Sequence, residues 1–121
     1  MSRNGDVSLA WGDGEYSFRL AYGELEKLQE ACDAGPFHVL QALRSGTPRI
    51  EHILETIRWG LIGGGLSSSE ALRMTNLYVK ERPLAENVVT ATIILVAALY
   101  GGGDETDEAS PPEKKLEAGE G

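Results

Sequence analysis

Two short stretches near the N-terminus alternate apolar and polar residues, one on each side of the Gly-Asp-Gly sequence at positions 12–14. The apolar positions are Val7, Leu9 and Trp11 before this sequence, and Tyr16, Phe18 and Leu20 after it. Because side chains alternate between the two faces of a strand, this period of two predicts a β-hairpin with one apolar face. An isolated hairpin is only marginally stable in water, so we expect this face to pack against the rest of the chain.

From position 23 onward the apolar residues recur every three or four positions, which is the pattern of amphipathic helices. The expected helices cover about residues 23–32, 37–44, 47–62, 67–82 and 83–100, with Thr47 and Pro48 capping the third. Together these elements predict an α+β fold. We expect an N-terminal β-hairpin packed on a bundle of about four to five α-helices, in a single domain over residues 1–102.

Two of the expected helices carry more apolar surface than one packed face requires. One stripe of the third consists of Ile50, Ile53, Leu54, Ile57 and Leu61. Trp59 lies about 180° from Ile50, so this helix is either packed between two neighbours or presents Trp59 to a partner. The last helix is polar only near its start, so it either crosses the centre of the domain or presents one face to a partner. The candidate partner-binding residues are Trp59, Ile62, Leu84 and Val88.

A run of glycines in the sequence RWGLIGGGLSSSEA, at positions 58–71, raises the question of a phosphate-binding loop. Leu66 stands where a Walker loop has lysine, and the helical pattern before the glycines does not fit the strand of a dinucleotide-binding fingerprint. We expect a joint between two helices instead. Residues 63–65 would supply a left-handed cap and a tight turn, and Ser67 with Glu70 would form the capping box of the next helix.

Residue types that usually carry chemistry are sparse in this chain. His38 and His52 are the two histidines and lie on different expected helices. The single cysteine, Cys32, lies on an apolar stripe, where an inert buried thiol is typical. We therefore expect no catalytic residues, no metal and no cofactor, and we do not expect an enzyme.

The overall charge and the distribution of apolar residues narrow the class of partner. A net charge of −8 argues against nucleic acid, because binding phosphates requires a basic surface. The longest apolar run, residues 88–100, is shorter than the ~20 residues that span a bilayer, and the N-terminus lacks the apolar core of a signal peptide. We expect a cytoplasmic protein that does not enter membranes.

Residues 103–121 are acidic and rich in proline and glycine, and we expect this tail to be disordered.

Three short elements resemble a known family through their order and spacing. They are Leu-Glu-x-Leu at 25–28, Gly-Leu-x-Gly-Gly-Gly at 60–65 and Pro-Leu at 83–84. Over about residues 4–102 the chain resembles the gene transfer agent family of small phage-derived tail proteins, which is related to phage tail assembly chaperones. The resemblance implies a non-enzymatic chaperone that binds the tape-measure protein during tail assembly. It carries over no catalytic residues and leaves self-association open.

The alternative is a structural tail component that is retained in the finished particle. A chaperone should be missing from purified particles, whereas a structural component should be present there in many copies. A third interpretation is a small prophage-encoded interaction protein. The sequence alone leaves the choice among these functions open.

Overall fold

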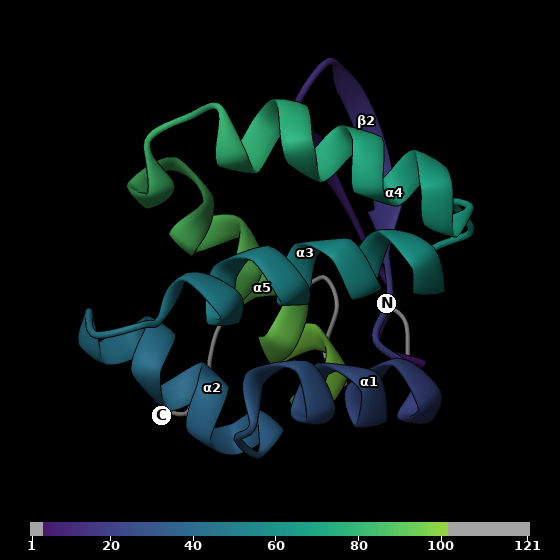
Figure 1. Ribbon diagram of the computed structural model, residues 1–121. Coiled ribbons are helices and arrows are strands. Elements are labelled where there is room, and N and C mark those ends of the chain that lie inside the picture. The colour runs from purple at the N-terminus through teal and green to yellow at the C-terminus, as the bar shows by residue number, and fades with distance from the viewer. Residues whose placement is uncertain (1–3, 102–121) are drawn as a thin grey trace, which may run out of the picture.

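The computed structural model describes residues 4–101, which form a short β-hairpin and a bundle of helices (Figure 1). In chain order the elements are β1 (Val7–Trp11), β2 (Gly14–Phe18), α1 (Tyr22–Cys32), α2 (Pro36–Ser45), α3 (Ile50–Gly63), α4 (Ser68–Thr75), the π-helical turn η1 (Asn76–Lys80), the 3-10 turn η2 (Leu84–Asn87) and α5 (Val88–Tyr100). This arrangement confirms the predicted α+β fold with its N-terminal hairpin. The tail for which we predicted disorder, 103–121, lies outside the described residues.

The hairpin packs its apolar face inward, as its period of two predicts. Strands β1 and β2 are antiparallel, with Val7 opposite Phe18. Gly12 occupies the turn at φ +60°, a conformation that glycine adopts without steric cost. The buried ring of Trp11 meets the ring of Tyr78 edge to face, with 5.6 Å between their centres. The hairpin is thereby tied to the segment that follows α4.

Helix α3 occupies the centre of the bundle. In Figure 1 it lies between α4 on one side and α1 and α2 on the other, with α5 behind it, and it contacts all four helices and β2. Ile53, Ile57 and Leu61 of its predicted stripe are buried, whereas Ile50 is 58% exposed because it is the first residue of the helix. The interpretation that this helix packs between neighbours is confirmed. A central position was one of the two predictions for the last helix, but α3 takes this position.

The start of α3 differs from the prediction. Thr47 and Pro48 do not cap the helix, which begins two residues after Pro48 with Arg49 at the N-cap position. The Arg49 backbone N–H donates to Nδ1 of His52 at 3.1 Å, and the Thr47 hydroxyl instead pairs with that of Ser45 at 3.0 Å. An imidazole three residues into the helix therefore plays the part that sequence rules give to a carboxylate or amide side chain.

The glycine run joins two helices, as predicted, but two of its glycines are needed for a different reason. A Cβ atom on Gly63 would lie 1.9 Å from the carbonyl oxygen of Arg19, and one on Gly64 would lie 2.0 Å from that of Ser17. The expected left-handed conformation is absent from Gly64, which caps α3 at φ −82°, and Gly65 alone of the three has positive φ, at +119°. The end of α3 can therefore approach the backbone of residues 17–19 only without side chains.

The predicted capping box at the start of α4 forms in part. The Ser67 hydroxyl accepts a hydrogen bond from the Glu70 backbone N–H at 3.2 Å. The Glu70 carboxylate does not return to Ser67 but pairs with Arg73, one turn further along the helix. After Thr75 the helix widens into the π-helical turn η1, whose Val79 is buried.

Asn87, a polar residue near the start of the expected last helix, is buried, at 3% exposure. Its Oδ1 accepts a hydrogen bond from Trp11 Nε1–H at 2.7 Å, and its Nδ2 donates to the carbonyl oxygen of Tyr78 at 2.8 Å. One amide thus links β1, η1 and the start of α5. Both of its hydrogen-bonding groups are satisfied, which explains why a polar residue is tolerated there.

Candidate protein-binding surface

Trp59, the leading candidate anchor for a partner, is half-buried and packs against the hydrophobic core. Its Nε1–H donates to Glu55 Oε1 at 3.1 Å, and the Arg58 guanidinium lies over its ring, 4.6 Å from the ring centre. Arg58 also donates to the same Glu55 oxygen. Because the core and neighbouring side chains of its own helix cover much of the indole, only part of the ring is left for a partner to contact.

The other three candidate residues come from three different elements. Ile62 lies near the end of α3 and Val88 at the start of α5, and both are half-buried against the core. Leu84, in η2, is 39% exposed. The protein's own core therefore covers most of the apolar surface of two of these three side chains.

A more exposed apolar surface runs along α5. It consists of Val89, Ile93, Val96 and Tyr100, which we call the α5 stripe. Val89 is 66% exposed, Ile93 38% and Tyr100 63%, while Val96 is half-buried. At its C-terminal end the Tyr100 ring meets the exposed ring of Phe37 on α2, with 6.1 Å between the ring centres. The last helix therefore exposes one face, and the expectation that this face contacts a partner stays a prediction.

The sequence contained a signal for this stripe, although it was not specific. Positions 89, 93, 96 and 100 follow the i, i+4, i+7, i+11 spacing of one helix face. Positions 88, 91, 95 and 98 follow an equally good helical spacing, and those residues are buried or half-buried. Since α5 is apolar nearly all round, its pattern cannot show which face is turned inward.

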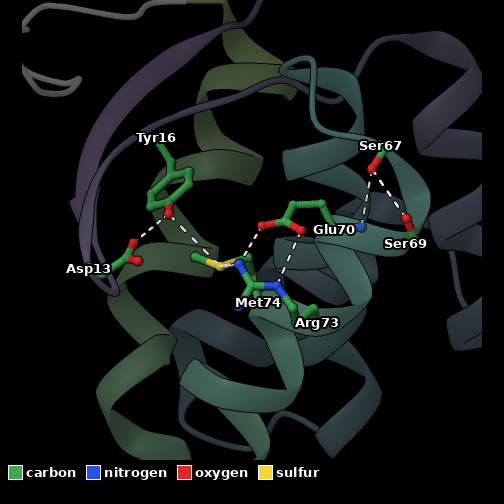
Figure 2. Close-up of polar contacts among 7 residues, drawn as sticks. All are labelled: Asp13, Tyr16, Ser67, Ser69, Glu70, Arg73 and Met74. Carbon is green, nitrogen blue, oxygen red and sulfur yellow. Dashed lines mark hydrogen bonds and ion pairs between the residues drawn. The ribbon is translucent and has the colours of Figure 1, made fainter.

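A group of polar side chains lies where the hairpin turn meets α4 (Figure 2). The Tyr16 hydroxyl donates to the Asp13 carboxylate and also approaches the Met74 sulfur at 3.9 Å. The hydrogen bond to Asp13 raises the pKa of Tyr16 to about 12, so the phenol stays protonated at neutral pH and is a poor base or nucleophile. Arg73 pairs with Glu70, and this hydrogen bond lowers the pKa of the carboxyl group. Of these contacts only that of Tyr16 with Met74 joins the hairpin to α4, and together they assemble no nucleophile–base pair.

The histidines and the cysteine lie on α1, α2 and α3. Cys32 is buried, and desolvation, with further contributions from Glu55 and Glu51, raises the pKa of its thiol to about 11. The rings of His38 and His52 meet edge to face, 6.1 Å apart. Within residues 4–101, the His, Cys, Asp and Glu side chains form no group of three or more that could hold a metal ion.

The comparisons with known proteins give a family. A family model described as "Phage tail tube protein, GTA-gp10" matches residues 4–117. The chain belongs to this family. Searches of curated proteins and of solved structures gave no match. Membership of the GTA-gp10 tail tube family confirms the resemblance to the gene transfer agent and phage tail proteins.

The family bears on the functions that the sequence left open. Its description names a component of a phage tail, which fits the alternative of a structural tail component better than the chaperone. Among residues 4–101, no helix has both the length and the apolar character needed to cross a bilayer.

Proposed function

We propose that this protein is a structural component of the tail of a phage or gene-transfer-agent particle. It acts through contacts with other tail proteins and not through catalysis, and it is built into the tail in the cytoplasm of the producing cell. The observation that carries this proposal is the GTA-gp10 tail tube family match, which spans every described residue.

The α5 stripe supports a function based on contacts. Large apolar side chains that stay exposed on a small domain are typical of interaction surfaces when they lie together. The four residues repeat at the spacing of a helix seam, and a helix from an adjacent tail subunit would fill it side by side. We therefore assign this stripe to a helix of a neighbouring subunit.

The test is a double substitution, Val89→Asp with Ile93→Asp, introduced into a strain that produces particles. Both side chains are partly or largely in solvent, so the variant should fold with a melting temperature close to that of the wild type. It should be missing from purified particles when these are analysed by mass spectrometry. Leu72→Asp on α4 is the matched control, because Leu72 is also apolar and 49% exposed, and this variant should be incorporated. A wild-type chain that is itself missing from purified particles would refute the structural role.

A second candidate is a tail assembly chaperone that binds the tape-measure protein. One observation favours it: exposed large apolar side chains occur on every helix of the described region and on η1 and η2. They are Tyr22, Phe37, Ile50, Leu72, Leu77, Leu84, Val89, Ile93 and Tyr100. Many separate apolar contacts would suit a long hydrophobic client better than a single docking interface would.

Co-expression with the tape-measure protein tests the chaperone. A chaperone should raise the soluble fraction of the tape-measure protein and co-purify with it, yet be missing from particles. If the tape-measure protein is equally soluble with and without this chain, and no complex is recovered, the chaperone function is excluded.

A further inference from the structure

A pocket of about 270 Å³ lies between the end of α2 and the start of α3. The polar side chains that line it are those of His38, Gln41, Ser45, Thr47, Arg49 and His52, which we call the histidine pocket. Nothing in the proposed tail function accounts for this pocket. Its lining contains no Asp or Glu, although the chain as a whole carries a net charge of −8.

The most buried polar side chain of the pocket has an atom without a hydrogen-bond partner. His52 is 2% exposed, and its Nε2 is buried with no hydrogen-bond partner among the described residues. Buried polar groups in folded proteins are nearly always paired, because an unpaired one keeps the full cost of leaving water. His52 lines the pocket, so a ligand that reaches its covered Nε2 would supply the missing partner.

The other nitrogen of His52 decides what kind of ligand fits. Nδ1 accepts the Arg49 backbone N–H at 3.1 Å, so in the neutral imidazole the hydrogen must be on Nε2. Burial lowers the pKa of His52, and the nearby charges of Arg49 and His38 lower it further against the opposing effect of Glu51, so the ring is neutral at pH 7. Nε2–H is then a hydrogen-bond donor without a free lone pair, which disfavours a metal ion and calls for an acceptor.

The surroundings favour a charged acceptor. Residues 34–50 contain Arg44 and Arg49 and no acidic residue. Glu51, at the next position, pairs with Arg49 at 3.6 Å, and both side chains are largely exposed, so a ligand carboxylate would compete with Glu51 for this guanidinium. We propose that the histidine pocket binds a carboxylate of an acidic peptide segment, with His52 Nε2–H and the Arg49 guanidinium as its donors. A charge-assisted pair of this kind gives both affinity and orientation.

A neighbouring groove shows how a peptide would extend from the pocket. It is lined by Phe37, Leu40, Gln41, Arg44, Ser45 and Tyr100, and it shares Gln41 and Ser45 with the histidine pocket. The exposed rings of Phe37 and Tyr100 offer apolar contact, and Arg44 offers a second positive charge. The carboxylate has two candidate sources: the acidic sequence at 104–108, which follows shortly after Tyr100 in the chain, or an acidic segment of another tail protein.

The test uses the full chain labelled at histidine and the peptide acetyl-Asp-Glu-Thr-Asp-Glu-amide, which copies residues 104–108. Its amide analogue, acetyl-Asn-Gln-Thr-Asn-Gln-amide, is the control peptide. We expect the acidic peptide to shift the imidazole NMR signals of His52 and His38 saturably, and the control peptide to leave them unchanged. Equal shifts with both peptides would overturn the proposal.

Two substitutions separate binding from folding. His52→Asn keeps an acceptor near the place of Nδ1 and removes the Nε2 donor, so the affinity for the acidic peptide, followed through His38, should fall about ten-fold. His52→Gln places an amide N–H near the position of Nε2 and loses the cap on Arg49, so it should bind nearly as well as the wild type while melting at a lower temperature. If His52→Asn binds the peptide as tightly as His52→Gln does, Nε2 is not a ligand contact and the proposal fails.

The source of the carboxylate is assigned with a full-length chain in which the segment is neutralised, D104N/E105Q/D107N/E108Q. If the chain's own segment occupies the pocket, neutralising it removes a competitor, and the added acidic peptide should bind about ten-fold more tightly. If another protein supplies the carboxylate, this affinity should match that of the wild type. A lack of saturable shift in both chains at millimolar peptide would show that the pocket is not a carboxylate site.

Discussion

The close approach of α3 to β2 predicts that Gly64 cannot carry a side chain. Its backbone, at φ −82° and ψ −4°, is open to alanine, so the conformation itself gives no reason for glycine. A Cβ atom there would lie 2.0 Å from the Ser17 carbonyl oxygen and 2.6 Å from the carbonyl carbon. Real Cβ contacts are essentially never below 3.0 Å, so one backbone must move by about 1.0 Å, the difference between 3.0 and 2.0. No rotamer change can relieve the clash, because the opposing atoms belong to the main chain.

The energetic effect of Gly64→Ala follows from what that movement disturbs. Forcing an extra carbon into a packed contact costs about 1–3 kcal/mol, and the shift also strains the 2.9 Å hydrogen bond from Arg19 N–H to the Gly60 carbonyl oxygen, worth about 1 kcal/mol. Phe18, which is fully buried, lies next to the contact and would be displaced from the core. We expect the free energy of unfolding to fall by about 2–4 kcal/mol.

Urea unfolding followed by tryptophan fluorescence measures this change. Gly23→Ala is the control, because a Cβ atom on Gly23 meets nothing within 4 Å and the residue lies in α1. That substitution should not destabilise the protein, because alanine has a higher helix propensity than glycine. If Gly64→Ala unfolds within about 0.5 kcal/mol of the wild type, the conclusion that β2 requires glycine at this position is wrong.

Three further predictions concern one hydrogen-bonded pair and two single side chains. In a double-mutant cycle of Trp11→Phe and Asn87→Leu, each single change leaves a buried polar group unpaired. The effects of the two changes on the free energy of unfolding should therefore be coupled by about 1 kcal/mol or more. Additive effects would refute a stabilising hydrogen bond. Trp59→Ala should lower the free energy of unfolding by about 3 kcal/mol because the indole packs on the core, whereas unchanged stability with lost partner binding would identify Trp59 as an anchor. Cys32 should resist thiol reagents at pH 8 until the chain unfolds. Since its folded pKa of about 11 lies above the ordinary value of 9.0, stability should also fall as the pH rises from 9 to 11, and a flat profile would contradict the raised pKa.

The features that the sequence predicted correctly are those set by neighbouring residues. The hairpin follows from alternation on either side of a glycine turn, and the helices follow from apolar spacing and from stop signals such as Gly46, which takes φ +80° after α2. The predicted start of α3 was wrong because two local groups compete to cap this helix. Sequence rules favour the Thr47 hydroxyl, yet the buried imidazole of His52 forms the cap instead.

The features that the sequence missed depend on partners far along the chain. Gly64 is constrained by Ser17, and Asn87 is buried because it pairs with Trp11, at a separation that no local pattern reports. The candidate surface shows the same limit, since the choice between Val88 and its neighbour Val89 depends on how α5 is rotated. That rotation is fixed by packing against α2 and α3 and not by the uniformly apolar sequence of the helix itself.

The α5 stripe and the histidine pocket form one continuous region, because Tyr100 ends the stripe and lines the groove that adjoins the pocket. A single partner could therefore use both, with apolar residues along α5 and acidic residues beyond Tyr100. The two parts should contribute differently to binding. The apolar seam should persist in high salt, whereas the contacts to Arg44 and Arg49 should weaken as ionic strength rises. A partner whose affinity depends on Val89 but not on salt would use the stripe alone, and this comparison separates the tail interface from the carboxylate site.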